Sequence, residues 1–286
     1  MTGLAAATAL TPVADGRFEA DLSPEWEVWG PQGGYLASVA LRAAGVASDR
    51  ARPASINTHF VGAGASGPVT VTTTVNRATK VGTSVSVEVT QPSDRGERLL
   101  LTAIVWGVDD ELPGLEHQVD DTPIGNMQPD GLADMATLMA DRGGPPHPFW
   151  HNLEQRPLSW IDDWDNRPAA DPIVHCWFRF VDGETHDEPW LDACRSLVVL
   201  DLEGWGAATR PHVGTLEHFA PTIELSCRFL GSTSNDAWLL SQAQSPVARG
   251  GLVAHNGEIW TPDSRLVATG GSTLLCRPAA RRPDGR

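Results

Sequence analysis

The tripeptide Phe60-Val61-Gly62 recurs as Phe229-Leu230-Gly231, 169 positions further along the chain. The same offset carries Gly82 onto Gly251. Self-similarity at one fixed offset indicates two copies of a single supersecondary unit. A solenoid needs about three or more copies, so the sequence predicts a duplicated domain.

Each copy has the pattern of one strand, one helix and four further strands. In the first copy an Ala-rich segment follows Gly33-Gly34, and its apolar positions 36, 39, 40, 43 and 44 have helical spacing. Valines alternate with polar residues in the strands that follow, as in a sheet with one buried face. The strands expected in the first copy are 17–22, 54–61, 69–77, 83–91 and 98–108. Those expected in the second copy are 173–180, 222–230, 238–244, 250–260 and 265–276, with a helix near 187–202.

A long helix against an antiparallel sheet, present twice, predicts an α+β fold in which each helix covers one sheet face. Joining two such units edge to edge removes two exposed strand edges. This is the geometry of a double hotdog, in which two tandem units each wrap an antiparallel sheet around a long helix. We assign residues 1–115 to the N-terminal unit and 171–286 to the C-terminal unit. Residues 116–170, rich in Pro, Gly and Asp, form a crossover linker with a short helix expected at 132–141.

Charge and composition argue against several kinds of partner. The net charge of −15 lacks the basic footprint that nucleic acid requires, and it disfavours an anionic membrane surface. No apolar run reaches the ~20 residues of a membrane span, so no membrane insertion is expected. The N-terminus lacks the basic region of a signal peptide, and the four cysteines are widely spaced. We therefore expect free thiols and a cytoplasmic protein.

Two motifs suggest cofactors, but neither has the necessary context. The run 62–67, Gly-Ala-Gly-Ala-Ser-Gly, matches a dinucleotide-binding pattern, yet it leads into another strand where a helix N-terminus is needed. His147 and His151 are four positions apart, but the prolines around them disfavour a helix and no third ligand is evident. The sequence therefore predicts neither a metal nor a redox cofactor.

Both copies carry short motifs in a fixed order. The N-terminal stretch is Trp29-Gly30-Pro31-Gln32-Gly33-Gly34-Tyr35-Leu36-Ala37. The C-terminal copy carries Leu200-Asp201-Leu202-Glu203 followed by Pro211-His212, then Thr222-Ile223-Glu224-Leu225-Ser226, Trp238-Leu239-Leu240 and Leu266-Val267-Ala268. This ordered set resembles the acyl-CoA thioesterase II-like, double hotdog family. The resemblance covers most of the chain outside the linker.

The resemblance implies a catalytic Asp, Thr and Gln that together hold and activate a water molecule. The Asp carries over to Asp201 and the Thr to Thr222, but the position of the Gln, six residues after Leu266, is occupied by Ser272. Ser donates and accepts hydrogen bonds but reaches less far than Gln. In the first copy Pro53 stands where Thr222 stands in the second. We therefore expect the site to be built from side chains of the second copy.

The residues themselves are suited to thioester hydrolysis. Asp201 follows the apolar run 197–200, and a partly buried carboxylate with a raised pKa is a better general base. Without the resemblance, Asp201 is equally an ion-pair partner or a helix-end residue, and Thr222 an ordinary strand residue. The helix start at Gly33, Gly34 and Tyr35 offers N–H groups to the carbonyl oxygen of a bound thioester.

Two charged residues follow Thr222 at even spacing. Glu224 and Arg228 lie two and six residues after it, so in a regular strand they share its face and line the same site. Pairing at the surface explains them equally well.

The combined interpretation is an acyl-CoA thioesterase that produces free fatty acid and CoA. The alternative is a catalytically weak or inactive acyl-CoA- or lipid-binding protein of the same fold. A hydratase fits less well because its Asp-x-Asn-Pro-x-His signature is absent from the sequence. The resemblance also implies a homo-oligomer, either a dimer or a tetramer.

Overall fold

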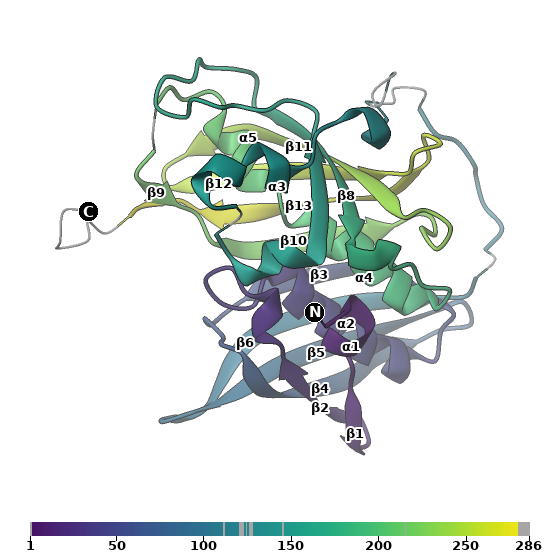
Figure 1. Cartoon of the computed structure of the whole chain (residues 1–286). Coiled ribbons are helices and arrows are strands. Elements are labelled where there is room, and N and C mark those ends of the chain that lie inside the picture. Colours follow the sequence, from purple (N-terminus) through teal and green to yellow (C-terminus); the bar gives the residue numbers. More distant parts are fainter. Residues whose placement is uncertain are drawn as a thin grey trace.

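The computed structural model describes residues 2–110, 112–119, 123, 125, 128–144, 146–214 and 216–279, so the expected linker is described only in part. Twelve strands form one antiparallel sheet in the order β1-β2-β4-β5-β6-β3-β10-β13-β12-β11-β8-β7. This sheet passes through both copies of the repeat (Figure 1). A second, two-stranded sheet pairs β9 with β14.

The expected strands and helices occur in the expected order with shifted bounds, and several short elements that were not expected are also present. The strands are β1 (Thr11–Ala14), β2 (Arg17–Leu22), β3 (Arg52–Phe60), β4 (Gly67–Ala78), β5 (Gly82–Ser93), β6 (Gly96–Val108), β7 (Leu153–Pro157), β8 (Ile173–Phe180), β9 (His218–Phe219), β10 (Thr222–Phe229), β11 (Trp238–Arg249), β12 (Leu252–Trp260), β13 (Leu266–Leu275) and β14 (Arg277–Pro278). The α-helices are α1 (Leu4–Ala7), α2 (Gly33–Ser48), α3 (Met135–Leu138), α4 (Pro189–Leu200) and α5 (Gly204–Thr209). Short 3-10 turns occur at Pro24–Trp26, Pro129–Gly131, Ala140–Arg142, Pro148–Asn152 and Val181–Gly183.

The two copies join through one pair of strands at the middle of the large sheet. Strand β3 of the first copy pairs antiparallel with β10 of the second, and Asn57 lies opposite Ser226. Each copy thereby lends the other a partner for an otherwise exposed edge. The expected α+β double hotdog fold is confirmed.

The helices α2 and α4 form the centre of the molecule and pack against each other. Most of their residues are buried, including all eleven residues of α4 from Trp190 onward and the apolar stripe of α2. The two helix backbones come close together at Gly34. A Cβ atom at this position would lie 2.7 Å from the Leu197 carbonyl oxygen and 2.7 Å from Val198 Cα. Glycine is therefore required for the two helix backbones to meet here.

The helix expected near 187–202 in the second copy is α4, which is shorter than expected, and a further helix, α5, follows it outside the expected range. Helix α4 ends at Leu200, Asp201 adopts a non-helical C-cap conformation, and α5 begins at Gly204. The helix expected at 132–141 is also shorter, because α3 covers only four residues and a 3-10 turn follows it. Propensity alone did not indicate the break after Leu200. The break places residues 201–203 in a turn at the centre of the molecule.

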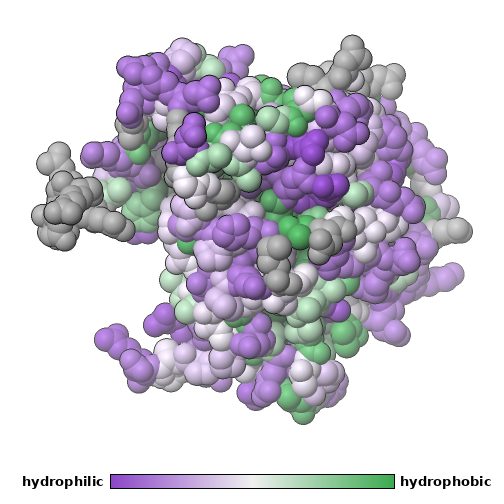
Figure 2. Space-filling model, viewed as in Figure 1, coloured by the Kyte–Doolittle hydropathy of each residue, from purple (hydrophilic) through white to green (hydrophobic). Residues whose placement is uncertain are grey.

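The surface agrees with the acidic composition of the chain. On the face shown in Figure 2, hydrophilic residues cover most of the area and hydrophobic residues are interspersed among them. Among the described helices, none combines the length and apolar character that crossing a membrane requires.

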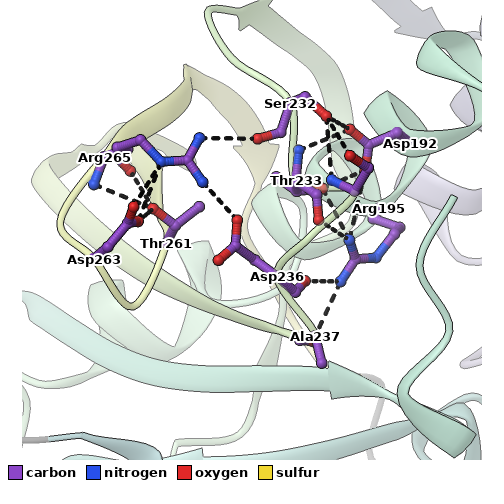
Figure 3. A network of polar contacts seen from close by, with 10 residues as sticks. Asp192, Arg195, Ser232, Thr233, Asp236, Ala237, Thr261, Asp263 and Arg265 are labelled. Atoms are coloured by element: carbon purple, nitrogen blue, oxygen red, sulfur yellow. Dashed lines mark hydrogen bonds and ion pairs between the residues drawn. The ribbon is translucent and has the colours of Figure 1, made fainter. Parts of the chain in front are cut away.

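A polar network fixes α4 to the loop between β10 and β11 (Figure 3). The Arg195 guanidinium is fully buried and donates to the Thr233 carbonyl at 2.8 Å and to the Asp236 carbonyl at 2.7 Å. Asp192 lies 3.5 Å from Arg195 and accepts from the Thr233 backbone N–H at 2.7 Å. At the outer end of the network, Arg265 pairs with Asp236 at 2.6 Å and is 47% exposed.

We expect Arg195→Met to lower the free energy of unfolding by about 3–5 kcal/mol, because it leaves the Asp192 carboxylate buried without its partner charge. Arg265→Ala in the same network should cost only about 0–1 kcal/mol, because that pair is exposed to solvent. Denaturant unfolding of both variants measures the difference. Equal losses for the two would contradict a buried role for Arg195.

Candidate active site

The Asp201 carboxylate is held by donors from both copies of the repeat. Thr222, at the start of β10, donates from its hydroxyl to Asp201 Oδ1 at 3.0 Å. The other oxygen, Oδ2, accepts from the Gly34 backbone N–H at 2.9 Å and from Gln32 Nε2 at 3.0 Å. The structure thus brings Asp201 and Thr222 together as expected. It also shows that the site is not built from the second copy alone.

Gly33 lets the carboxylate approach the start of α2. A Cβ atom at position 33 would lie 2.5 Å from Asp201 Oδ2 and 3.1 Å from the ring of Phe60. A Cβ atom essentially never lies as close as 2.5 Å to an oxygen to which it is not bonded, so a side chain at this position would displace the carboxylate. The two glycines therefore make room for different neighbours: Gly33 for the Asp201 carboxylate and Gly34 for the backbone of α4.

The N-terminus of α2 has one backbone donor left over. The first N–H groups of a helix have no partner within it. Here the Gly34 N–H donates to Asp201, and the Tyr35 N–H donates to Gln32 Oε1 at 2.7 Å. No such bond occurs for the Gly33 N–H among the described residues. This N–H is the donor that remains available to a ligand at the positive end of the α2 dipole.

Burial makes Asp201 easier to protonate than an ordinary aspartate. The residue keeps partial contact with solvent, but protein atoms surround its carboxylate. Burial raises the pKa of Asp201 from 3.8 to about 7, although the hydrogen bonds from Thr222 and Gly34 oppose that rise. A carboxylate with a pKa near neutrality has the proton affinity of a general base.

Ser272 is bound to a different partner than Asp201. Its hydroxyl is 3.0 Å from Nδ1 of His255 on the neighbouring strand β12, and both side chains are buried. No hydrogen bond connects Ser272 with Asp201 or Thr222 in the described part of the chain. The amide that contacts Asp201 is that of Gln32, a residue that the sequence motifs contained but did not single out. Its position just before a helix start, where a side chain can cap the first turn, was the available signal.

Glu224 and Arg228 do not share the face of Thr222, contrary to the expectation. Strand β10 changes register between Thr222 and Glu224, so Thr222 lies opposite Leu274 while Glu224 lies opposite Thr273. Directly opposed residues share a face, and this bulge therefore sends Glu224 and Arg228 to the opposite face. Arg228 is exposed, and Glu224 accepts a hydrogen bond from Thr273 at 3.2 Å.

Tyr35 is a core residue and does not line the site. Its ring is fully buried, and its hydroxyl donates to the Ala7 carbonyl at 2.9 Å and accepts from the Ser23 N–H at 3.0 Å. Burial raises the pKa of Tyr35 to about 12. The expectation of a substrate contact is wrong for this side chain, because its polar atom is already satisfied within the N-terminal unit.

The fold repeats the geometry of this site at a second place, but with different residues. Asp49 follows α2 as Asp201 follows α4, and Trp190 is the second residue of α4 as Gly34 is of α2. Asp49 is exposed and its backbone is left-handed, with φ 51°. Trp190 is buried and donates from Nε1 to the Arg50 carbonyl at 2.9 Å. A ring fills this second junction where glycine leaves room at the first.

Metal and disulfide chemistry do not arise from the described residues. No group of three or more His, Cys, Asp or Glu side chains among them is placed to hold a metal ion. The four cysteines are free thiols, three of them buried.

Comparisons with known proteins place the chain in a family. The model of the acyl-CoA thioesterase N-terminal domain matches residues 22–107, and that of the acyl-CoA thioesterase C-terminal domain matches residues 129–274. The chain therefore belongs to the acyl-CoA thioesterase family of double hotdog proteins, as its motifs suggested. No match was found among the curated proteins.

Solved structures share the fold at low sequence identity. Acyl-CoA thioesterase II TesB2 from Mycobacterium marinum has a TM-score of 0.76 at 20% identity, covering 99% of this chain and 100% of its own. A putative thioesterase II from Thermobifida fusca has a TM-score of 0.77 at 19% identity, covering 97% and 98%. The dehydratase domain of RzxB from Pseudomonas fluorescens is less similar, with a TM-score of 0.57 at 11% identity and coverage of 92% and 94%. The fold alone therefore does not separate hydrolysis from dehydration.

The raised pKa of Asp201 predicts a pH-dependent cost to stability. Because its folded-state pKa of about 7 exceeds the ordinary 3.8, the group favours folding most below about pH 4 and loses this contribution as pH rises through about 7. Asp201→Asn removes this titration. We expect the thermal midpoint of the variant, relative to the parent, to rise by on the order of 5 °C between about pH 4.5 and about pH 8.

Thermal unfolding at several pH values checks this prediction. Glu203, whose pKa burial also raises to about 7, is present in both proteins and cancels in the difference. A difference in midpoint that does not change with pH would contradict a buried, partly protonated Asp201.

Proposed function

We propose that the protein hydrolyses acyl-CoA thioesters through a water molecule activated by Asp201. The observation that carries this proposal is the carboxylate itself, which three donors hold in place and whose pKa lies near 7. Membership of the acyl-CoA thioesterase family supports the thioester as substrate.

Hydrogen-bond occupancy identifies the oxygen that acts as base. A carboxylate offers about two acceptor directions on each oxygen. Among the residues that the structure describes, two donate hydrogen bonds to Oδ2, Gly34 and Gln32, whereas one, Thr222, donates to Oδ1. The attacking water therefore donates to Oδ1 of Asp201, and the Thr222 oxygen beside it accepts the second water proton.

The reaction then proceeds in two balanced steps. The water oxygen forms a bond to the thioester carbon as its proton passes to Asp201, and the carbonyl oxygen becomes an oxyanion. The free Gly33 N–H, at the positive end of α2, stabilises this negative charge. When the tetrahedral intermediate collapses, the carbon–sulfur bond breaks and Asp201 returns its proton to the CoA thiolate. The products are a free carboxylic acid and CoA.

Gln32, rather than Ser272, is the third polar group that we assign to this site. Its amide donates to Asp201 Oδ2 while its carbonyl oxygen caps the α2 N-terminus. It therefore fixes the carboxylate and the oxyanion-binding end of the helix relative to each other. This arrangement places the amide on the first copy of the repeat.

We expect Asp201→Asn to lower kcat/KM for acyl-CoA hydrolysis by at least about 100-fold, because it removes the base. Asp49→Asn is the matched control: it changes the residue that follows the equivalent helix, and it should alter kcat/KM by less than about twofold. Gln32→Ala should lower kcat/KM by about tenfold, because the Asp201 carboxylate is then held less firmly in position. Release of free thiol from acyl-CoAs of several chain lengths measures all three.

The same assay decides between hydrolysis and simple binding. Saturable acyl-CoA binding with no thiol release at any chain length would establish a non-catalytic binding protein and overturn the proposal. Full activity in Asp201→Asn would show that another group is the base.

The pH dependence gives an independent check on the base. Because Asp201 must be ionised to accept a proton, kcat/KM should rise with pH and level off above about 7. The Thr222 hydrogen bond lowers the pKa of Asp201, so Thr222→Val should move this limb to higher pH as well as lowering the plateau. A limb that does not move in this variant would place the titration on a different group.

A further inference from the structure

We propose that His255 is a positioning residue for Asp201. Its ring supports the turn that carries Asp201 and so fixes the position of the carboxylate. This inference rests on the proposed function of Asp201. His255 does not touch Asp201; it acts through the turn of residues 201–203, between α4 and α5.

At both ends of this turn, glycines allow the chain to pack closely against the inner face of the sheet. Just before the turn, the two methyl groups of Leu200 sit over Gly257 and Gly270. Cβ atoms at these positions would lie 2.5 Å and 2.7 Å from the methyls. Just after the turn, Gly204 sits on the His255 ring, and a Cβ atom there would lie 2.8 Å from His255 Cγ. The height of the turn above the sheet is therefore set by Leu200 on one side and by the His255 ring on the other.

Ser272 determines the orientation of that ring. Its hydroxyl is 3.0 Å from His255 Nδ1, and the two residues lie opposite each other on β13 and β12. Their row continues to Leu225 on β10, next to the row that contains Thr222 and Leu274. The His255–Ser272 pair thus lies on the same face as Thr222 and one row away from it.

His255 is costly as a purely structural residue. It is 3% exposed, and Nε2 has no hydrogen-bond partner among the described residues. An unpartnered buried polar atom typically destabilises a fold, because it has lost its hydrogen bonds to water without replacement. Burial also lowers the pKa of His255 to about 4, so the ring is neutral near pH 7. The ring is flat and neutral, and its Nδ1 edge is held by Ser272. It can therefore pack directly against Gly204 without adding a charge near the turn.

The test is a double-mutant cycle on Gly204 and His255 in the full chain. Gly204→Ala should lower kcat by about tenfold with KM changed less than about twofold, because the new methyl group lifts the turn off the ring and displaces Asp201. His255→Ala should also lower kcat, because the turn loses its support. In the His255→Ala background, Gly204→Ala should cost less than about twofold, because the clash no longer exists.

Ser272→Ala provides a milder second variant. It leaves the ring in place but frees its orientation, so kcat should fall by about threefold or more without a change in KM. His175→Ala is the matched control. His175 is on strand β8, away from the turn, and its Nε2 atom lies 2.8 Å from Gln242 Oε1. Its replacement by alanine should leave kcat unchanged.

Several outcomes would overturn the inference. One is an equal loss of kcat on Gly204→Ala with and without His255, and another is an unchanged kcat in His255→Ala. A fall in kcat that tracks thermal stability equally in His255→Ala and His175→Ala would assign His255 a purely structural role. These failures are distinct from failure of the proposed function, in which Asp201→Asn itself remains active.

Discussion

The contact between the Asp201 carboxylate and the N-terminus of α2 is the interaction on which the site depends. It joins the end of one long helix to the start of the other, and therefore one copy of the repeat to its partner. A carboxylate is favoured at this position by the helix dipole and by the unpaired N–H groups. The contact is possible only because α4 stops at Leu200 and because Gly33 leaves space for the carboxylate oxygen.

Two opposed effects set the pKa of Asp201. Burial favours the neutral acid, while the donors from Thr222 and Gly34 favour the ionised form. With burial alone, the group would stay protonated and could not accept a proton; with exposure alone, it would be too weak a base. The intermediate position near pH 7 leaves a buried charge that the folded protein tolerates at some cost to its stability.

The fold was predictable because its evidence is local and repeated. Alternating valines in the strands, the apolar spacing of α2 and the repeat between Phe60 and Phe229 all point to two helix-on-sheet units. The pairing of Asp201 with Thr222 was implied by the resemblance of the ordered motifs to the acyl-CoA thioesterase family.

Long-range contacts and irregular geometry limited the prediction of the site. Gln32 is 169 residues from Asp201, and no periodicity reports a contact between helix ends of different units. Glu224 and Arg228 were assigned to the wrong face because a bulge in β10 breaks the alternation on which the assignment relied. The Tyr35 hydroxyl is satisfied by Ala7 and Ser23, which sequence spacing does not show.

The two helix junctions show how a duplicated fold can keep one site and close the other. At the junction that holds Asp201, the incoming helix begins Gly33-Gly34; at its counterpart, the helix begins Pro189-Trp190. The Trp190 ring packs so closely on Gly45 that a Cβ atom there would lie 2.7 Å from it, and its N–H is taken up by the Arg50 carbonyl. The Asp49 side chain at this junction is exposed to solvent, and its backbone is left-handed. The closed junction gains the buried area of a large aromatic ring without the cost of a buried charge. One junction therefore carries a buried aromatic ring, whereas the other carries the carboxylate of Asp201.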